Sequence, residues 1–167
     1  MTETTFNPIT SLTINNEEVK AKATFMFDKT AKKFATEQED NKGRKQTISG
    51  FTNVYNALLE RDTVAIVDFW ECATAYLGKS APKREDIEAE IMEIMEIIER
   101  ENDTLNLLQG ALDVMNNSGF FKQKSRLFWT QMNQAPSLAK EDEKEGAKAG
   151  IEMMKNNYKE IMTVAPY

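Results

Sequence analysis

Residues 63–77 read TVAIVDFWECATAYL, and this stretch decides the fold class. Wound as a helix, it carries apolar side chains around most of its surface, which is typical of a helix in the centre of a protein. Asp62 or Thr63 can cap its beginning, and Gly78 can end it. The sequence therefore predicts one central helix around which other helices pack.

Apolar residues recur at helical spacing on both sides of the central stretch. Ser49 and Asp103 are suitable N-caps, and Pro82 suits the first turn of a helix because proline is tolerated there. The polar residues 36–47 are expected to form an exposed loop. Besides the central helix, the helices expected from these patterns cover residues 27–34, 50–60, 82–98, 103–118 and 120–132.

The N-terminal part of the chain has a strand-like pattern. Residues 19–25 alternate between apolar and polar side chains, as a strand with one buried face does. The inward positions are Val19, Ala21, Ala23 and Phe25. Asn15-Asn16 suits a tight turn after Leu12-Thr13-Ile14, because Asn tolerates positive φ. We expect a hairpin that packs on the helices, since a lone hairpin is barely stable in water.

A change of composition separates the C-terminal part of the chain. Pro136 marks a boundary, and the residues from there to Gly150 are small and highly charged. The apolar residues at helical spacing beyond it are Ile151, Met154, Tyr158 and Ile161. They predict a semi-independent helix or a tail that folds on a partner.

The expected fold class is therefore mainly α (α+β). It comprises an N-terminal β-hairpin, a compact bundle of about five to six helices and a charged C-terminal helix or tail. The corresponding division of the chain is a flexible arm over residues 1–11, a core domain over 12–134 and a C-terminal part over 135–167.

The composition argues against the common enzyme classes. The chain of 167 residues has one cysteine and no histidine. Histidine is the commonest general base, and a lone cysteine can build neither an internal disulfide nor a zinc site made of cysteines alone. No glycine-rich phosphate loop is present. We expect no catalysis, no metal and no cofactor.

The charge and hydropathy of the chain restrict its partners. The net charge is −6 and the pI about 4.9, which makes nucleic acid and anionic membranes poor partners. No apolar run approaches the ~20 residues that span a bilayer. Residues 88–101 are rich in Glu and form either a solvated helix face or a cation site, of which we favour the first. We likewise favour a buried structural role for Cys72 over a reactive thiol, and a solvated loop over a binding patch for Lys42–Lys45.

Residues 118–129 are the most distinctive stretch, because aromatic residues there alternate with cations. Core packing and a protein interface both remain open, since interfaces use aromatic residues and Arg as anchors. The methionines near the C-terminus also suit either a core or a surface that accepts partners. The candidate partner-binding residues are Phe120, Phe121, Arg126, Phe128, Trp129, Met132, Met153, Met154, Tyr158 and Met162.

Two motifs are the most telling at the level of a family. They are Pro82-Lys83-Arg84-Glu85-Asp86-Ile87 at a helix start and Ser118-Gly119-Phe120-Phe121-Lys122 between two helices. Together with the hairpin at residues 12–17, their order over residues 11–129 resembles the tail assembly chaperone family of long-tailed phages (siphoviruses) of Gram-positive bacteria.

The resemblance implies a non-enzymatic chaperone with several protein partners. Such a chaperone binds the long, helical tape-measure protein, keeps it soluble and helps to bring major tail protein subunits to it. The resemblance also implies a homo-oligomer that works in the host cytoplasm and is absent from the mature virion. Two other roles stay open: a structural component of the tail or head–tail connector, and a small phage regulatory protein.

Overall fold

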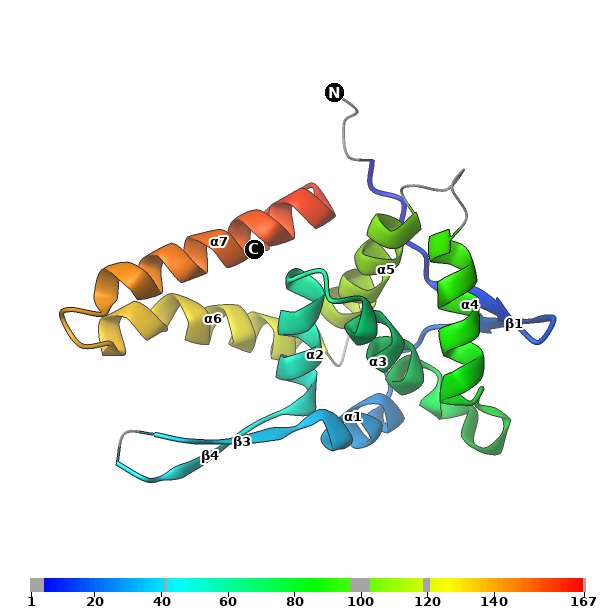
Figure 1. Ribbon diagram of the computed structural model, residues 1–167, viewed down its shortest axis with the longest axis horizontal. Coiled ribbons are helices and arrows are strands. Elements are labelled where there is room, and N and C mark those ends of the chain that lie inside the picture. The colour runs from blue at the N-terminus through cyan, green and yellow to red at the C-terminus, as the bar shows by residue number, and fades with distance from the viewer. Residues whose placement is uncertain (1–4, 41, 97–102, 119–120, 167) are drawn as a thin grey trace.

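The computed structural model describes residues 5–40, 42–96, 103–118 and 121–166. It confirms the mainly α (α+β) class, with a helical body and two small antiparallel hairpins (Figure 1). The strands are β1 (Ser11–Ile14), β2 (Glu17–Lys20), β3 (Thr36–Glu39) and β4 (Lys45–Ile48). The α-helices are α1 (Phe25–Ala31), α2 (Gly50–Leu59), α3 (Thr63–Ala73), α4 (Arg84–Glu96), α5 (Asp103–Asn117), α6 (Lys122–Leu138) and α7 (Lys144–Met162). The 3-10 helices are η1 (Lys32–Phe34) and η2 (Ala75–Ser80).

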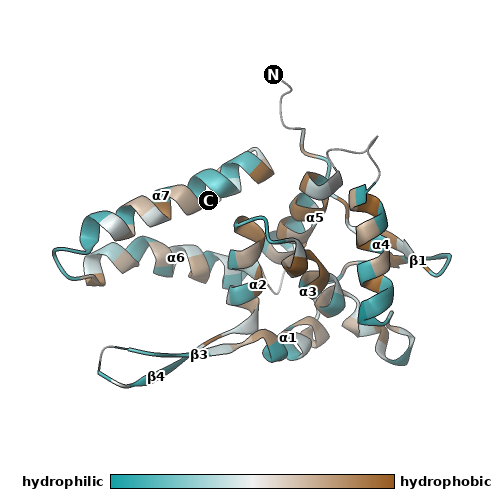
Figure 2. Cartoon of the chain, viewed as in Figure 1, coloured by the Kyte–Doolittle hydropathy of each residue, from teal (hydrophilic) through white to brown (hydrophobic). Residues whose placement is uncertain are grey.

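Helix α3 lies at the centre of the core, as its apolar pattern predicts. It packs against α1, α2, α4 and α5, and apolar residues concentrate on it and its neighbours (Figure 2). Asp62 caps it by accepting a hydrogen bond from the backbone N–H of Val64 at 2.9 Å. The helix ends at Ala73 rather than at Leu77, and η2 follows it. Its fully buried side chains include Ile66, Phe69, Trp70 and Cys72.

The N-terminal hairpin is confirmed, but its second strand is shorter than expected. Leu12 pairs with Val19, and Asn15 and Asn16 make the turn with φ of 53° and 66°. Strand β1 packs on α4, which supplies the support that an isolated hairpin lacks. Phe25 was wrongly expected to point inward: α1 begins there, so the period of two no longer applies, and Phe25 is 73% exposed.

The polar segment over residues 36–47 was wrongly expected to be a loop. It is exposed, but most of it forms the hairpin β3–β4, with Thr36 opposite Ile48 and Glu39 opposite Lys45. Alternation of apolar and polar residues reveals a strand only when one face is buried. Both faces of this hairpin are exposed to solvent, so its sequence does not alternate between apolar and polar residues.

Helix α6 continues beyond the end expected at Met132. It runs to Leu138, and the expected boundary residue Pro136 lies inside it, buried. Helix α7 packs along α6 and also contacts α5 and α2. The apolar stripe of α7 explains this, because Ile151, Tyr158 and Ile161 are all buried. The division expected after residue 134 thus falls within a helix.

The described part of the expected flexible arm lies against α5. The backbone N–H of Ile9 donates to the carbonyl of Asn106 at 3.0 Å. Gly110 allows this approach, because a Cβ there would lie only 1.7 Å from the carbonyl oxygen of Ile9. Residues 1–4 of the arm are outside the described part of the chain.

A cluster of charges fastens α4 to α3. Arg84 donates to Asp68 at 2.8 Å and to Glu71 at 2.6 Å, and Lys33 also pairs with Glu71. Burial raises the pKa of Glu71, but the hydrogen bonds from Lys33 and Arg84 outweigh burial and hold this pKa below its usual 4.5.

Glu71→Gln is expected to lower the stability at neutral pH and to make it less sensitive to acid. The folded pKa of Glu71 is below the unfolded one, so its contribution is present above the unfolded pKa and is lost as pH falls through the folded pKa. Urea midpoints of both proteins at neutral pH and below about pH 4 measure this. If acid lowered the urea midpoints of the wild type and of Glu71→Gln by the same amount, Glu71 would not be the source of this acid sensitivity.

Candidate functional site

The structure divides the candidate partner-binding residues into buried and accessible groups. Phe121, Phe128, Trp129, Tyr158 and Met162 are buried. Met132 and Met154 are half-buried, whereas Arg126 and Met153 are exposed. Phe120 lies outside the described residues.

The aromatic stretch mainly supplies core packing, the first of the two interpretations left open. The ring of Phe121 lies 4.9 Å from that of Phe27 and 5.2 Å from that of Phe51, centroid to centroid. Lys124, one of the alternating cations, extends over the rings of Phe51 and Phe121 and pairs with Asp28 of α1. The aromatic ring of Phe121 and the cation of Lys124 thus both contact residues of α1 and α2.

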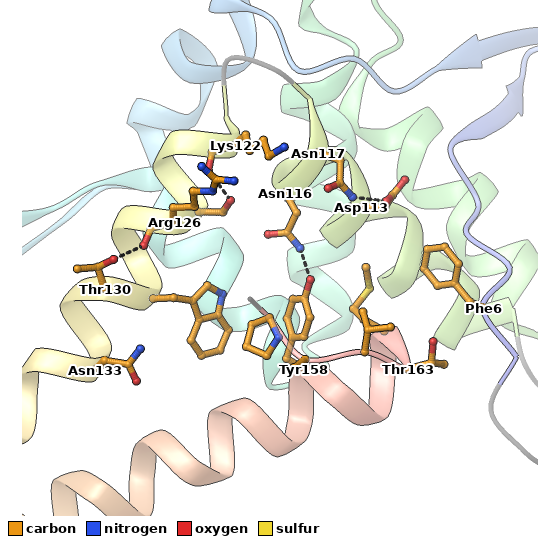
Figure 3. Close-up of a pocket in the computed structure, with 16 residues that line it drawn as sticks. Phe6, Asp113, Asn116, Asn117, Lys122, Arg126, Thr130, Asn133, Tyr158 and Thr163 are labelled. Carbon is orange, nitrogen blue, oxygen red and sulfur yellow. Dashed lines mark hydrogen bonds between the residues drawn. The ribbon is translucent and has the colours of Figure 1, made fainter.

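Four of the ten candidates come together at one recess: Arg126, Trp129, Tyr158 and Met162. This α5–α7 recess has a volume of about 760 Å³ and lies between the end of α5, the first half of α6 and the end of α7 (Figure 3). Residues 163–166, which follow α7, and Phe6 of the N-terminal arm complete its wall. A space of this size is typical of sites that take a small molecule or a few large side chains.

A chain of buried and part-buried hydrogen bonds shapes the aromatic side of the recess. Trp129 Nε1 donates to Tyr55 Oη at 2.9 Å, and Tyr55 Oη donates to Asn116 Oδ1 at 2.8 Å. Asn116 Nδ2 donates in turn to Tyr158 Oη at 2.7 Å (Figure 3). Burial and the nearby Asp113 carboxylate raise the pKa of Tyr158 to about 12, so its hydroxyl stays protonated at neutral pH. This chain of hydrogen bonds thus links α6, α2, α5 and α7.

Gln109 holds the described part of the N-terminal arm and the end of α7 beside this recess. Its Oε1 accepts from the backbone N–H of Asn7 at 2.8 Å, and its Nε2 donates to the carbonyls of Thr5 and Ile161 at 3.0 and 2.9 Å. Gln109 is fully buried, so these bonds satisfy an amide that would otherwise be costly to bury. The wall formed by the arm and the end of α7 is therefore positioned by one side chain.

The mouth of the recess is polar and carries cations. Lys122 and Arg126 line it and are exposed. Asp113 also lines it, and its Oδ1 accepts a hydrogen bond from Asn117 Nδ2 at 2.6 Å. The recess therefore combines cations at its mouth with the rings of Trp129 and Tyr158, which are 3% and 5% exposed.

Asn116 and Gln109 were not among the residues expected at the site. Both lie on the apolar side of α5, seven residues apart, which puts them on one helix face. A polar residue on an otherwise buried helix face needs a partner, and that is the signal that was available.

Other candidate chemistry finds little support in the described part of the chain. Burial raises the pKa of the Cys72 thiol to about 12, which favours the structural role. Within residues 5–40, 42–96, 103–118 and 121–166, no cluster of three acidic or Cys side chains is placed to hold a metal ion. No described helix is both long and apolar enough to cross a bilayer.

Fold and site together define a mainly helical protein with a recess between α5, α6 and α7 that carries cations at its mouth. The family model described as "Phage tail assembly chaperone protein, TAC" matches residues 11–128, and the chain belongs to this family. Membership in a chaperone family indicates a non-enzymatic role. Neither the curated proteins nor the solved structures contain a significant match to this chain.

Proposed function

We propose that this chain binds the tape-measure protein of a long-tailed phage and keeps it soluble until the tail is assembled. The observation that carries the proposal is the α5–α7 recess, where Arg126, Trp129 and Tyr158 meet, in a member of the tail assembly chaperone family. The exposed apolar residues of the recess wall, Phe6 and Val164, would hold apolar side chains of a helical client, and Arg126 would pair with its acids. The net charge of −6 would keep the complex in solution.

The proposal extends to the place and order of assembly. The chaperone would act in the host cytoplasm, bring major tail protein subunits to the bound tape-measure protein and leave before the virion is complete. Mass spectrometry of purified particles tests the last step. Finding this chain there in stoichiometric amounts would instead favour a structural component of the tail.

The first experiment is co-expression with the tape-measure protein of the same phage, followed by a pull-down on this chain. We expect the tape-measure protein to become soluble and to co-elute, and major tail protein to join the complex when it is added. A tape-measure protein that stays aggregated while this chain elutes alone would contradict the proposal.

Thr130→Trp is expected to abolish most of this co-elution. Thr130 is exposed and lines the recess, so an indole there would fill the space that the client needs. The fold should persist, because the Thr130 hydroxyl donates its hydrogen bond to the carbonyl of Arg126 within its own helix and so ties no other element to α6. Co-elution yield and the midpoint of thermal unfolding are measured together.

Gln131→Trp is the matched control. Gln131 is the next residue of α6 and is exposed, but it is not part of the recess wall. It should therefore retain the client. If both variants lose the client equally, or if both retain it, the recess is not the client site.

A further inference from the structure

The hairpin β3–β4 is an exposed arm of the molecule. It extends away from the helical body (Figure 1), and seven of its eight strand residues are exposed. Its base is held by Asn53, whose Nδ2 donates to the carbonyl of Phe34 at 2.9 Å and to Thr36 Oγ1 at 3.0 Å. In the described part of the chain each strand pairs only with the other, so both outer edges lack a strand neighbour.

The register shows which residues direct their backbone groups outward. The N–H of Asp40 donates to the carbonyl of Arg44 at 2.9 Å, so these two residues form a hydrogen-bonded pair. In an antiparallel ladder, hydrogen-bonded pairs alternate with pairs whose two residues are not hydrogen-bonded to each other. The next pair, Glu39 opposite Lys45, is of the second kind, so its N–H and C=O groups point away from the partner strand. The pair of Glu37 and Thr47 does the same. These four residues form the free edges of the hairpin.

The two free edges carry opposite charge. Glu37 and Glu39 make the β3 edge acidic, and Lys45 makes the β4 edge basic. The four edge residues lie on one face of the hairpin because they alternate with Gln38 and Gln46. Side chains of paired edges would therefore meet on the same face.

Hydrogen bonds to Asp40 tie the ends of the two strands together. Asp40 Oδ1 accepts from the backbone N–H groups of Lys42 and Arg44 at 2.9 and 2.8 Å, and Oδ2 accepts from Arg44 Nε at 2.7 Å. The backbone hydrogen bond from Arg44 is the main cause of the lowered pKa of Asp40. Because these hydrogen bonds hold Lys42 and Arg44 against Asp40, strand pairing at the edges would cost less conformational entropy.

We propose that the β3 edge of one copy pairs with the β4 edge of a second copy, so that hairpins join head to tail in a continuous antiparallel sheet. This pairing puts Glu37 and Glu39 beside Lys45 of the next copy. Pairing of two β3 edges would instead oppose acids, and pairing of two β4 edges would oppose lysines. A pair of copies keeps one free β3 edge and one free β4 edge, so the assembly can grow from copy to copy.

Charge reversal tests this pairing in the full-length chain. Sedimentation velocity at low salt is expected to show the wild-type mass rising with concentration from 19.0 kDa to at least twice that value. E37K/E39K makes both edges basic, and K45E/T47E makes both edges acidic. Each variant alone is expected to stay at the mass of one chain, and an equimolar mixture should regain association, because unlike edges are again available.

E93K/E96K is the matched control, since it changes the net charge as E37K/E39K does but at exposed residues of α4. It should associate like the wild type. A wild type that stays at single-chain mass, a mixture that fails to regain association, or a control that loses it would each overturn the proposal. Because client binding is measured separately by co-elution, the proposed function can stand or fall independently.

Discussion

Gly50→Ala is expected to destabilise the protein by about 3 kcal/mol or more, at the upper end of overpacking effects. A Cβ at residue 50 would lie 1.6 Å from the carbonyl oxygen of Ala31. The clashing atom belongs to the backbone at the end of α1, so no side-chain rotation can relieve the clash. Either α2 or the end of α1 must move, and both pack against the central helix. Urea unfolding of both proteins measures the difference.

Gly146→Ala is the control for this prediction. Gly146 lies in α7 and is exposed, and a Cβ at this residue would meet no atom within 4 Å apart from those of its chain neighbours and the nearby backbone of its own helix. Alanine loses less backbone entropy than glycine in a helix, so this variant should gain roughly 0.5–1 kcal/mol. A Gly50→Ala protein as stable as the wild type would show that α1 and α2 are not held as closely as described.

Trp129→Ala is expected to cost about 3–5 kcal/mol, the range for removing a buried tryptophan. Trp129 is 3% exposed, and its ring lies 5.3 Å from that of Phe128 and 5.7 Å from that of Tyr158. The substitution also removes the hydrogen bond from Nε1 to Tyr55 Oη at 2.9 Å. For a domain with a typical stability of about 5–15 kcal/mol this is a large fraction, so thermal unfolding should shift strongly downward.

Arg126→Ala is the control at the same recess. Arg126 is exposed on α6, so its loss should change the unfolding midpoint little while it weakens client binding. Trp129→Ala with an unchanged midpoint would contradict the packing described for α6 and α7. The pair separates loss of the fold from loss of the client, which a substitution of buried aromatics alone cannot do.

Local sequence signals predicted the helices whose limits depend on nearby residues. Ser49 accepts the hydrogen bond from the backbone N–H of Thr52 at 3.1 Å, and α2 begins at the next residue as expected. Asp62 caps α3 in the same way. Caps and apolar periodicity act within a few residues, so they can be recognised without knowledge of the fold.

Helix α6 shows where such signals fail. Pro136 was interpreted as a boundary because proline interrupts helices, but α6 continues through it to Leu138. Pro136 is buried, and α7 packs along α6, so tertiary contacts offset the loss of a backbone hydrogen bond. The strength of such contacts depends on residues far along the chain, which no local pattern contains.

The candidate site likewise combines features that local sequence signals reveal with features that depend on tertiary contacts. Aromatic content marked Phe121, Phe128 and Trp129 as important, yet it could not distinguish anchors for a partner from core residues. Burial decides that question, and burial depends on what packs against a side chain. The recess needed Asn116 and Tyr158, which are 42 residues apart in the chain, to be brought together from two helices.

The sequence by itself determined the mainly helical class, the central position of α3, the N-terminal turn at Asn15 and Asn16, and the resemblance to a chaperone family. These depend on composition, periodicity and capping, which are local properties of the chain. Only the tertiary structure decided which aromatic residues belong to the core, that α7 packs against α6, and that the polar strands β3 and β4 form an exposed hairpin. These depend on contacts between distant segments, whose free energy comes from surface that becomes buried only when the whole chain is folded.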